Sequence, residues 1–589
     1  PGGDEDLEGG RFVRGALLLA LAGGISRFLG IFYLIPLPRL IGEEGMGLWQ
    51  MAGAWQGLLV VLASGGLPLA MARLVAEARA TGQGERENRL LRLGIGLAAL
   101  AGLGGMLALL SISPILALRL QRDEALVAVL RAFAPSVLLL ALSSVLRGYF
   151  QGCQAMGVAA ASEVAEQVFR VGSLLALGAA FAPGGPGAGA VGAAWGASIG
   201  GAAAVLLMVG ALLWRRVQRS RKARPQRQGG LRARPVVAGS RTGASGTGTR
   251  AGTKTGKATG AYRHPTLTLR DLGRDAPAGV ALALVYALVQ TAVAAVIPYR
   301  LRLAGIPVQQ IRELYGQFGL AFRLVSVPGF ISLALGAALL PAVAQARALG
   351  RLSAVAHRSE QAVRLLLLLA IPAATGLAVL ADPLARLVFG MPGVALPLRA
   401  AAAGVVGIML FQTTTGILQG LGLTYRPALN LALAGVLQVA LSWWWVGEAA
   451  NSGRAMAGAG AAATTSWLVA ATLNLLMIVG RTGITISVSD LFVRPLLASG
   501  GMAVLVGAVH PWLLDLSWRE SPWTPLAAVV GRQIWQELVW PGVACLVAVA
   551  AGVVSYGVLL AALGGLGWQE RRWLLRLARR EIPAGRDMA

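Results

Sequence analysis

Long apolar runs alternate with short polar connections along almost the whole chain. Fourteen of these runs have the length of about 18 residues or more that an α-helix needs to cross a bilayer. Six precede a long polar segment, at 12–38, 47–72, 93–118, 125–146, 158–181 and 189–214, and eight follow it, at 278–299, 314–344, 362–389, 399–418, 428–447, 456–480, 495–514 and 538–566. The pattern predicts an all-α polytopic membrane protein with about 14 transmembrane helices.

The composition favours a membrane protein and argues against an enzyme. Hydrophobic residues make up 56% of the chain and charged residues 13%, about half the charged share of soluble domains. Cys153 and Cys545 indicate no disulfide framework, and the three histidines are too far apart in sequence for a metal site. The sequence contains no nucleophile elbow and no paired-acid motif. We therefore expect no catalytic residues, no metal and no cofactor.

The segment 215–275 is polar and strongly basic, with 16 Lys and Arg against two Asp. Such a composition cannot bury a core, so we predict a disordered loop. The positive-inside rule places this loop in the cytoplasm, and with it both termini. We expect the loop to attract anionic lipid head groups rather than nucleic acid. The tail at 567–589 is predicted to form a basic amphipathic helix on the same surface.

The two halves of the chain contain similar short segments at one spacing. LRA at 130–132 recurs at 398–400, and the glycine-bounded 148–152 recurs at 416–420, in both cases 268 residues later. Chance matches between apolar runs rarely keep one offset in separate loops. The spacing indicates an internal duplication.

Each repeat contains six spans, so the two repeats enter the membrane in the same direction. This predicts two six-helix lobes, 12–214 and 276–480, related by a parallel internal repeat, with two further helices within 490–566. Transporters built from such repeats bind their substrate between the lobes near the bilayer midplane. A duplicated scaffold without transport is the alternative.

Charged side chains within the apolar runs are the first candidates for a site. Glu163, Glu166 and Arg170 lie at i, i+3 and i+7 and therefore share one helix face. A charge at the bilayer centre costs roughly 2.5–3.5 kcal/mol, so this face must contact a partner or a watery cavity. Two interpretations stay open: an ion pair that locks the fifth span to its neighbours, or part of a cavity wall.

Arg27 lies in the middle of the first run, with no acidic neighbour in sequence. A lone arginine there needs an acid from another span or an anionic ligand, and the planar guanidinium fork suits phosphate. Four further polar positions either bond another helix or contact a substrate: Gln50, Gln290, Gln317 and Arg323. With Arg27 and the charged face of the fifth span, they form the predicted central-cavity site.

Several motifs resemble one protein family. ISRFLGIFY around Arg27, GMGLWQM from Gly45, SEVAEQVFR from Ser162 and ILQGLGLTYRPALN from Ile417 are similar to the stage V sporulation protein B family and its relatives, the MurJ-like oligosaccharidyl-lipid flippases. These families form part of the multidrug/oligosaccharidyl-lipid/polysaccharide exporter superfamily. The resemblance extends over about residues 12–480.

The resemblance implies a flippase for undecaprenyl-pyrophosphate-linked sugars in the bacterial cytoplasmic membrane. Lipid II is the expected cargo, for peptidoglycan and spore-cortex synthesis. The resemblance also implies that Arg27, in the S-R-x-L-G motif, lines the central cavity. The family often carries an acid in its seventh span where this chain has Gln290. Coupling to sodium ion, proton or membrane potential therefore stays open, and we expect a monomer.

Four other functions remain under consideration. An exporter of another lipid-linked polysaccharide precursor would share almost every feature. A multidrug or cation antiporter of the same superfamily would need acids deep in the spans, and few are present. An integral-membrane glycosyltransferase would need catalytic acids on a substantial outer loop. A pure scaffold would tolerate the loss of Arg27.

Overall fold

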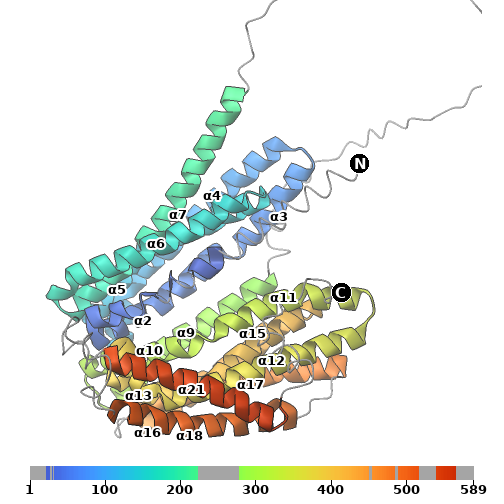
Figure 1. Ribbon diagram of the computed structural model, residues 1–589. Coiled ribbons are helices and arrows are strands. Elements are labelled where there is room, and N and C mark those ends of the chain that lie inside the picture. The colour runs from blue at the N-terminus through green and yellow to red at the C-terminus, as the bar shows by residue number, and fades with distance from the viewer. Residues whose placement is uncertain are drawn as a thin grey trace, which may run out of the picture.

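A computed structural model describes residues 22–26, 29–30, 32–222, 277–449, 454–483, 489–515 and 539–565 (Figure 1). This part of the chain holds 12 helices long and apolar enough to cross a membrane, or up to 13 if a bent pair counts as one span. The all-α polytopic fold is confirmed. The total of 14 spans stays a prediction, because about half of the first span, 12–38, lies outside the described residues. The predicted tail at 567–589 also lies outside them.

The N-terminal lobe contains the second to sixth predicted spans. Its elements are α2 (Pro36–Ser64), α3 (Leu67–Ala80), α4 (Gly84–Pro114), η1 (Ile115–Gln121), α5 (Glu124–Gly152), α6 (Met156–Phe181), η2 (Ala182–Gly184) and α7 (Pro186–Lys222). The second span is broken between α2 and α3 because Gly65 and Gly66 adopt φ values of 42° and 77°, which favour glycine. Helix α7 continues past the predicted end of its span at 214, whereas the rest of the predicted loop lies outside the described residues.

The C-terminal lobe follows the same order. Its elements are α9 (Pro277–Leu303), α10 (Val308–Ser326), α11 (Gly329–Ala348), α12 (Leu352–Val379), α13 (Ala381–Leu384), η3 (Ala385–Phe389), η4 (Pro392–Val394), α14 (Ala395–Ala401), α15 (Gly404–Gly420), α16 (Arg426–Ala449) and α17 (Ala455–Thr482). The eighth predicted span, 314–344, is two helices rather than one, because Pro328 has no N–H to donate and restricts the residue before it. The tenth is bent by 52° between α14 and α15.

Two further spans pack on the outside of the C-terminal lobe. They are formed by η6 (Ser489–Val493) with α18 (Arg494–Asp515), and by α21 (Trp540–Ala562). The Tyr556 hydroxyl in α21 donates a hydrogen bond to the Leu368 carbonyl in α12, at 2.9 Å. Met502 and Cys545 belong to one small apolar cluster with Leu380, at the end of α12. Both added helices are therefore attached to α12 rather than to the interface between the lobes.

Equivalent helices of the two lobes have related ends and related contacts. Helices α4 and α12 begin, and α5 and α15 end, 268 residues apart. A Cβ atom at Gly148 would overlap the backbone of Pro68 in α3, and one at Gly416 would overlap the backbone of Gly336 in α11. The same two helices thus touch backbone to backbone in each lobe. These contacts support the internal repeat, and they make each lobe a close-packed unit.

The two lobes form a V (Figure 1). They lie together at one end, where α2 of the first lobe meets α9 and α10 of the second. They separate toward the other end, where α3 and α11 finish. Arginines flank the connections that follow α3 and α11 at the separated end, among them Arg79, Arg86, Arg347 and Arg351. By the positive-inside rule this end faces the predicted inner side, so the V opens toward it.

Candidate functional site

The lobes meet where α2 crosses α10. A Cβ atom at Gly47 would overlap the carbonyl oxygen of Arg312, and one at Gly316 would overlap the carbonyl oxygen of Glu43. Glycine is required at both positions because the two backbones touch. Buried side chains from both lobes surround this crossing, among them Met51 of α2.

Polar contacts between the lobes lie beside the crossing. The Arg312 guanidinium donates two hydrogen bonds to the Asp123 carboxylate, at 2.8 and 2.7 Å, and lies 3.5 Å from Glu44. The hydrogen bonds to Asp123 raise the pKa of Arg312 above its ordinary value. Gln317 donates to the Glu43 carboxylate at 2.6 Å. Gln317 therefore lies at this closed end of the V and is not among the residues that line the cavity, contrary to the prediction.

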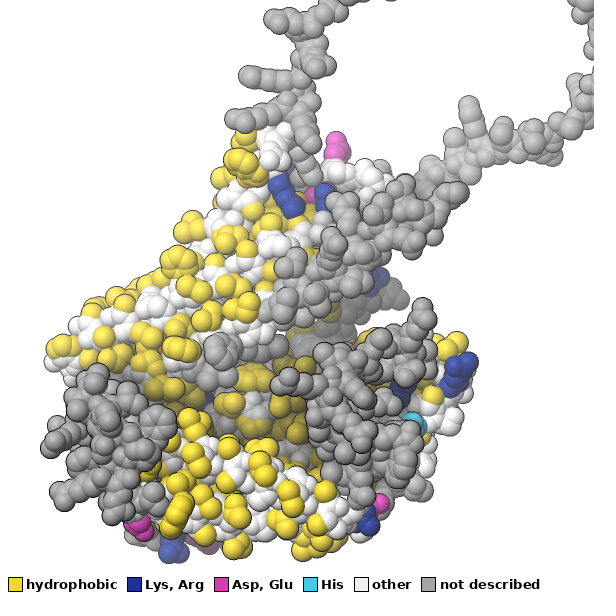
Figure 2. Space-filling view, in the orientation of Figure 1, with side chains coloured by type: hydrophobic (Ala, Val, Ile, Leu, Met, Phe, Trp, Pro, Cys, Tyr) yellow, Lys and Arg dark blue, Asp and Glu magenta, His cyan; other side chains and the backbone are white. Residues whose placement is uncertain are grey.

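A cavity of about 960 Å³ lies between the lobes. Figure 2 shows the molecule hollowed at this level. Six of the eight predicted site residues line the cavity: Gln50, Glu163, Glu166, Arg170, Gln290 and Arg323. Arg27 lies outside the described residues, although Ser26 and Gly30 on either side of it line the same cavity.

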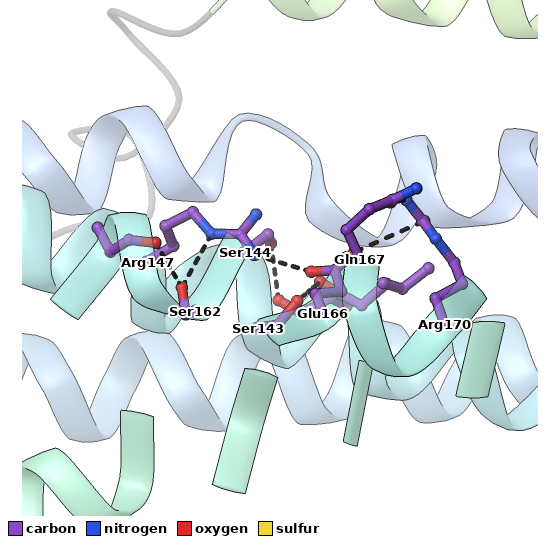
Figure 3. A network of polar contacts seen from close by, with 10 residues as sticks. Ser143, Ser144, Arg147, Ser162, Glu166, Gln167 and Arg170 are labelled. Atoms are coloured by element: carbon purple, nitrogen blue, oxygen red, sulfur yellow. Dashed lines mark hydrogen bonds and ion pairs between the residues drawn. The ribbon is translucent and has the colours of Figure 1, made fainter. Parts of the chain in front are cut away.

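Helix α6 presents its charged face to this cavity (Figure 3). The Arg147 guanidinium of α5 lies 2.7 Å from Glu166, and its Nε lies 3.4 Å from the Ser162 hydroxyl. Arg170 lies 3.7 Å from the other oxygen of Glu166 and donates a hydrogen bond to Gln167. The same face thus joins α6 to α5 through an ion pair and lines the cavity, so the two interpretations of this segment do not exclude each other.

Arg147 is a cavity residue that the sequence reasoning missed. It directly follows the predicted fourth span, 125–146, and was therefore not among the candidate residues. Arg147 lies five residues before the end of α5 and Glu166 ten residues after the start of α6, on the two sides of one short connection. Opposite charges on two helices joined by so short a connection are the signal that could have paired them.

The opposite wall carries Arg323 of α10 among aromatic rings. Its guanidinium carbon lies 4.8 Å from the centre of the Trp49 ring and 5.6 Å from that of Tyr33, and it donates a hydrogen bond to the Tyr33 hydroxyl. Within the described part of the chain, Arg323 forms no ion pair with a carboxylate. Gln290 donates to the Tyr286 hydroxyl at 3.1 Å. The guanidinium of Arg323 is thus positioned by cation–π contacts with the two rings, and its charge stays available to an anion.

The described lining of the cavity contains three arginines, at positions 147, 170 and 323, and two glutamates, at positions 163 and 166. Guanidinium groups on both walls suit a phosphate-bearing ligand, since each offers a planar fork of donors. Among the described residues, no group of three or more His, Cys, Asp or Glu side chains could hold a metal ion.

Comparison with known proteins confirms the resemblance that the motifs indicated. Residues 12–230 match the family model described as "Polysaccharide biosynthesis protein". The chain is 29% identical to stage V sporulation protein B of Bacillus subtilis over 435 residues, which cover 73% of this chain and 77% of that protein. It is 31% identical to lipid II flippase MurJ of the same organism over 173 residues, 28% of this chain and 32% of that protein.

Solved structures support the fold. A lipid II flippase MurJ in an inward closed conformation superposes with a TM-score of 0.62 at 13% identity, covering 95% of this chain and all (100%) of that chain. An inward-facing multidrug resistance MATE family transporter gives 0.56 at 16% identity, covering 76% of this chain and 94% of that chain. The chain is a multi-pass membrane protein with the two-lobe fold of these transporters.

Proposed function

We propose that this protein is a flippase that moves an undecaprenyl-pyrophosphate-linked sugar precursor, with lipid II as the cargo, across the bacterial cytoplasmic membrane. The product would serve peptidoglycan and spore-cortex synthesis. The observation that carries the proposal is the cavity between the lobes, with arginines on both walls and its closed end at the α2–α10 crossing. The relatives named for lipid II flipping and sporulation support the choice of cargo.

The geometry supports alternating access as the mechanism. The V opens toward the predicted cytoplasmic side, where both termini are proposed to lie, so the anionic head group enters from the cytoplasm. Arg323, which has no carboxylate partner among the described residues, offers positive charge on one wall, and Arg147 and Arg170 lie on the other. Closure of this mouth, with rupture of the Arg312 contacts at the opposite end, would expose the cavity to the outside. The lipid tail would stay in the membrane.

We propose that the membrane potential or a gradient of protons or sodium ions biases this cycle. The described lining of the cavity holds two carboxylates, Glu163 and Glu166. Gln290, at the family's acidic position, is neutral and bonds to Tyr286. Proton coupling would therefore act through α6 rather than through the seventh span.

The test is reconstitution in liposomes with lipid II, followed by its exposure in the outer leaflet. We expect flipping by the natural protein and its loss in Arg323→Ala and Arg27→Ala. Flipping that survives both substitutions would remove the cationic cavity from the mechanism. Absence of flipping under an imposed potential or sodium gradient would refute lipid II as cargo, and competition with other lipid-linked glycans would identify the alternative.

A further inference from the structure

The Glu166 carboxylate lies between two arginines that face the cavity (Figure 3). One oxygen is 2.7 Å from Arg147 and the other 3.7 Å from Arg170. Its side chain is 12% exposed, against 22% and 37% for the two arginines. A single carboxylate therefore contacts both guanidinium groups at the cavity wall. It lies where an anionic ligand of these arginines would bind.

We propose that Glu166 is an internal counter-ion that a ligand must displace, and that the cost of this displacement excludes lipids with a single phosphodiester while still admitting organic diphosphates. The inference rests on the proposed function for the natural cargo only. The selection itself concerns the chemistry of the anion and would hold for any lipid-linked diphosphate.

The selection follows from counting charges. A phosphodiester carries one negative charge, so its exchange for the carboxylate replaces one anion by another and gains little. A diphosphate carries at least two charges on adjacent phosphorus centres, so it satisfies both guanidinium groups at once with charge-assisted hydrogen bonds. The difference matters because the cavity lies within a membrane whose anionic phospholipids are mostly phosphodiesters. Glu166 would keep them out of the cavity.

Glu163 provides a matched control. It lies one helical turn before Glu166 on the same face and lines the same cavity. Within the described residues, Glu163 forms no ion pair with Arg147 or Arg170. Removing its charge changes the overall potential of the cavity by the same amount as removing that of Glu166, but leaves the arginine pair occupied.

The experiment compares two soluble probes, farnesyl diphosphate and dihexanoyl phosphatidylglycerol, by calorimetric titration of the detergent-solubilised full chain. We expect Glu166→Gln to tighten binding of both probes by about tenfold, because displacing Glu166 costs either anion the same free energy. Phosphatidylglycerol, which competes poorly with Glu166 in the natural protein, should then bind measurably. Glu163→Gln should change either affinity by no more than about twofold. The thermal unfolding temperature of each variant is measured alongside.

Each other outcome overturns either the inference or the proposed cargo. A lower unfolding temperature with unchanged affinities would make Glu166 a brace between α5 and α6. The same tenfold tightening for Glu163→Gln would assign the effect to net charge alone. Failure of lipid II flipping, with the expected tightening of both probes, would refute the proposed cargo and leave the counter-ion in place. Flipping of lipid II without that tightening would refute the counter-ion and leave the cargo in place.

Discussion

Asp123→Asn is expected to shift the protein away from the arrangement described here. The substitution removes the charge that holds Arg312 across the lobes but keeps the side-chain acceptor that caps α5 at the Ala125 amide, 3.0 Å away. Asparagine and aspartate cap helices about equally well. The change therefore tests the contact between the lobes without weakening the helix.

The magnitude follows from the burial of the pair. Breaking a buried ion pair costs about 3–5 kcal/mol. The Asp123 side chain is 4% exposed, but Arg312 is 21% exposed and keeps Glu44 at 3.5 Å, so only part of that cost applies. We expect about 2 kcal/mol, which changes the ratio of the two arrangements roughly 30-fold.

Double electron–electron resonance, which measures the distance between two spin labels, provides the assay for the separation of the lobes. Spin labels on Ala80→Cys and Leu349→Cys report the separation of α3 and α11 at the open end of the V, where both residues are exposed. The two native cysteines, Cys153 and Cys545, are buried. We expect one long distance for the natural sequence and a second, shorter population in Asp123→Asn.

A pair at the same predicted side of the membrane supplies the control. Arg399 and Asp382 form an ion pair within the C-terminal lobe, with side chains 52% and 55% exposed. Asp382→Asn should leave the distances unchanged, because exposed pairs contribute little and this one does not join the lobes. Identical distance distributions for Asp123→Asn and Asp382→Asn would refute the role of Arg312 as a lock.

Three further predictions concern the cavity wall, the closed end and the packing within a lobe. Arg323→Ala should weaken farnesyl diphosphate binding about tenfold or more in calorimetry, and Arg323→Lys should recover part of the loss, because it keeps the charge but not the planar fork. Burial and the neighbouring Glu43-Glu44 pair raise the pKa of the Glu313 carboxyl. A carboxyl with a raised pKa binds its proton more tightly in this arrangement. Falling pH should therefore stabilise the contact between the lobes at the closed end, and rising pH should weaken it. Glu313→Gln should remove that part of the pH dependence of the spin-label distances. Gly148→Ala should cost about 1–3 kcal/mol and lower the unfolding temperature, because its Cβ meets backbone, whereas Gly157→Ala, with open space around it, should not.

The positions and lengths of the apolar runs were sufficient to predict most of the fold. Thirteen predicted spans correspond to helices of the described chain, because a bilayer imposes both a length and a composition on each span. The interruptions within spans were harder to predict. The break at Gly65-Gly66 and the one before Pro328 lie inside apolar runs, and hydropathy carries no information on backbone direction.

The sequence predicted which site residues share one face of a helix, but not which residues of different helices contact one another. The spacing of Glu163, Glu166 and Arg170 gave one face, and that face lines the cavity. The aromatic contacts of Arg323 and the position of Gln317 depend on how α2 crosses α10, with partners more than 250 residues away in the sequence. Helix rotation and crossing angle are set by packing, which a single sequence does not display.

The glycine crossing of α2 and α10 has a mechanical consequence. Knobs and holes normally make one helix resist turning over another, since each side chain must leave its socket. At Gly47 and Gly316 no side chains stand between the backbones, so the crossing acts as a smooth pivot. Resistance to the swing then comes from the polar contacts and the buried side chains beside the pivot. A methyl group added at the pivot would slow the exchange between arrangements, whereas a change in the neighbouring charges would alter which arrangement is preferred. The rate of exchange between the arrangements thus depends on the glycines of this junction, and the favoured arrangement depends on the charged residues beside them.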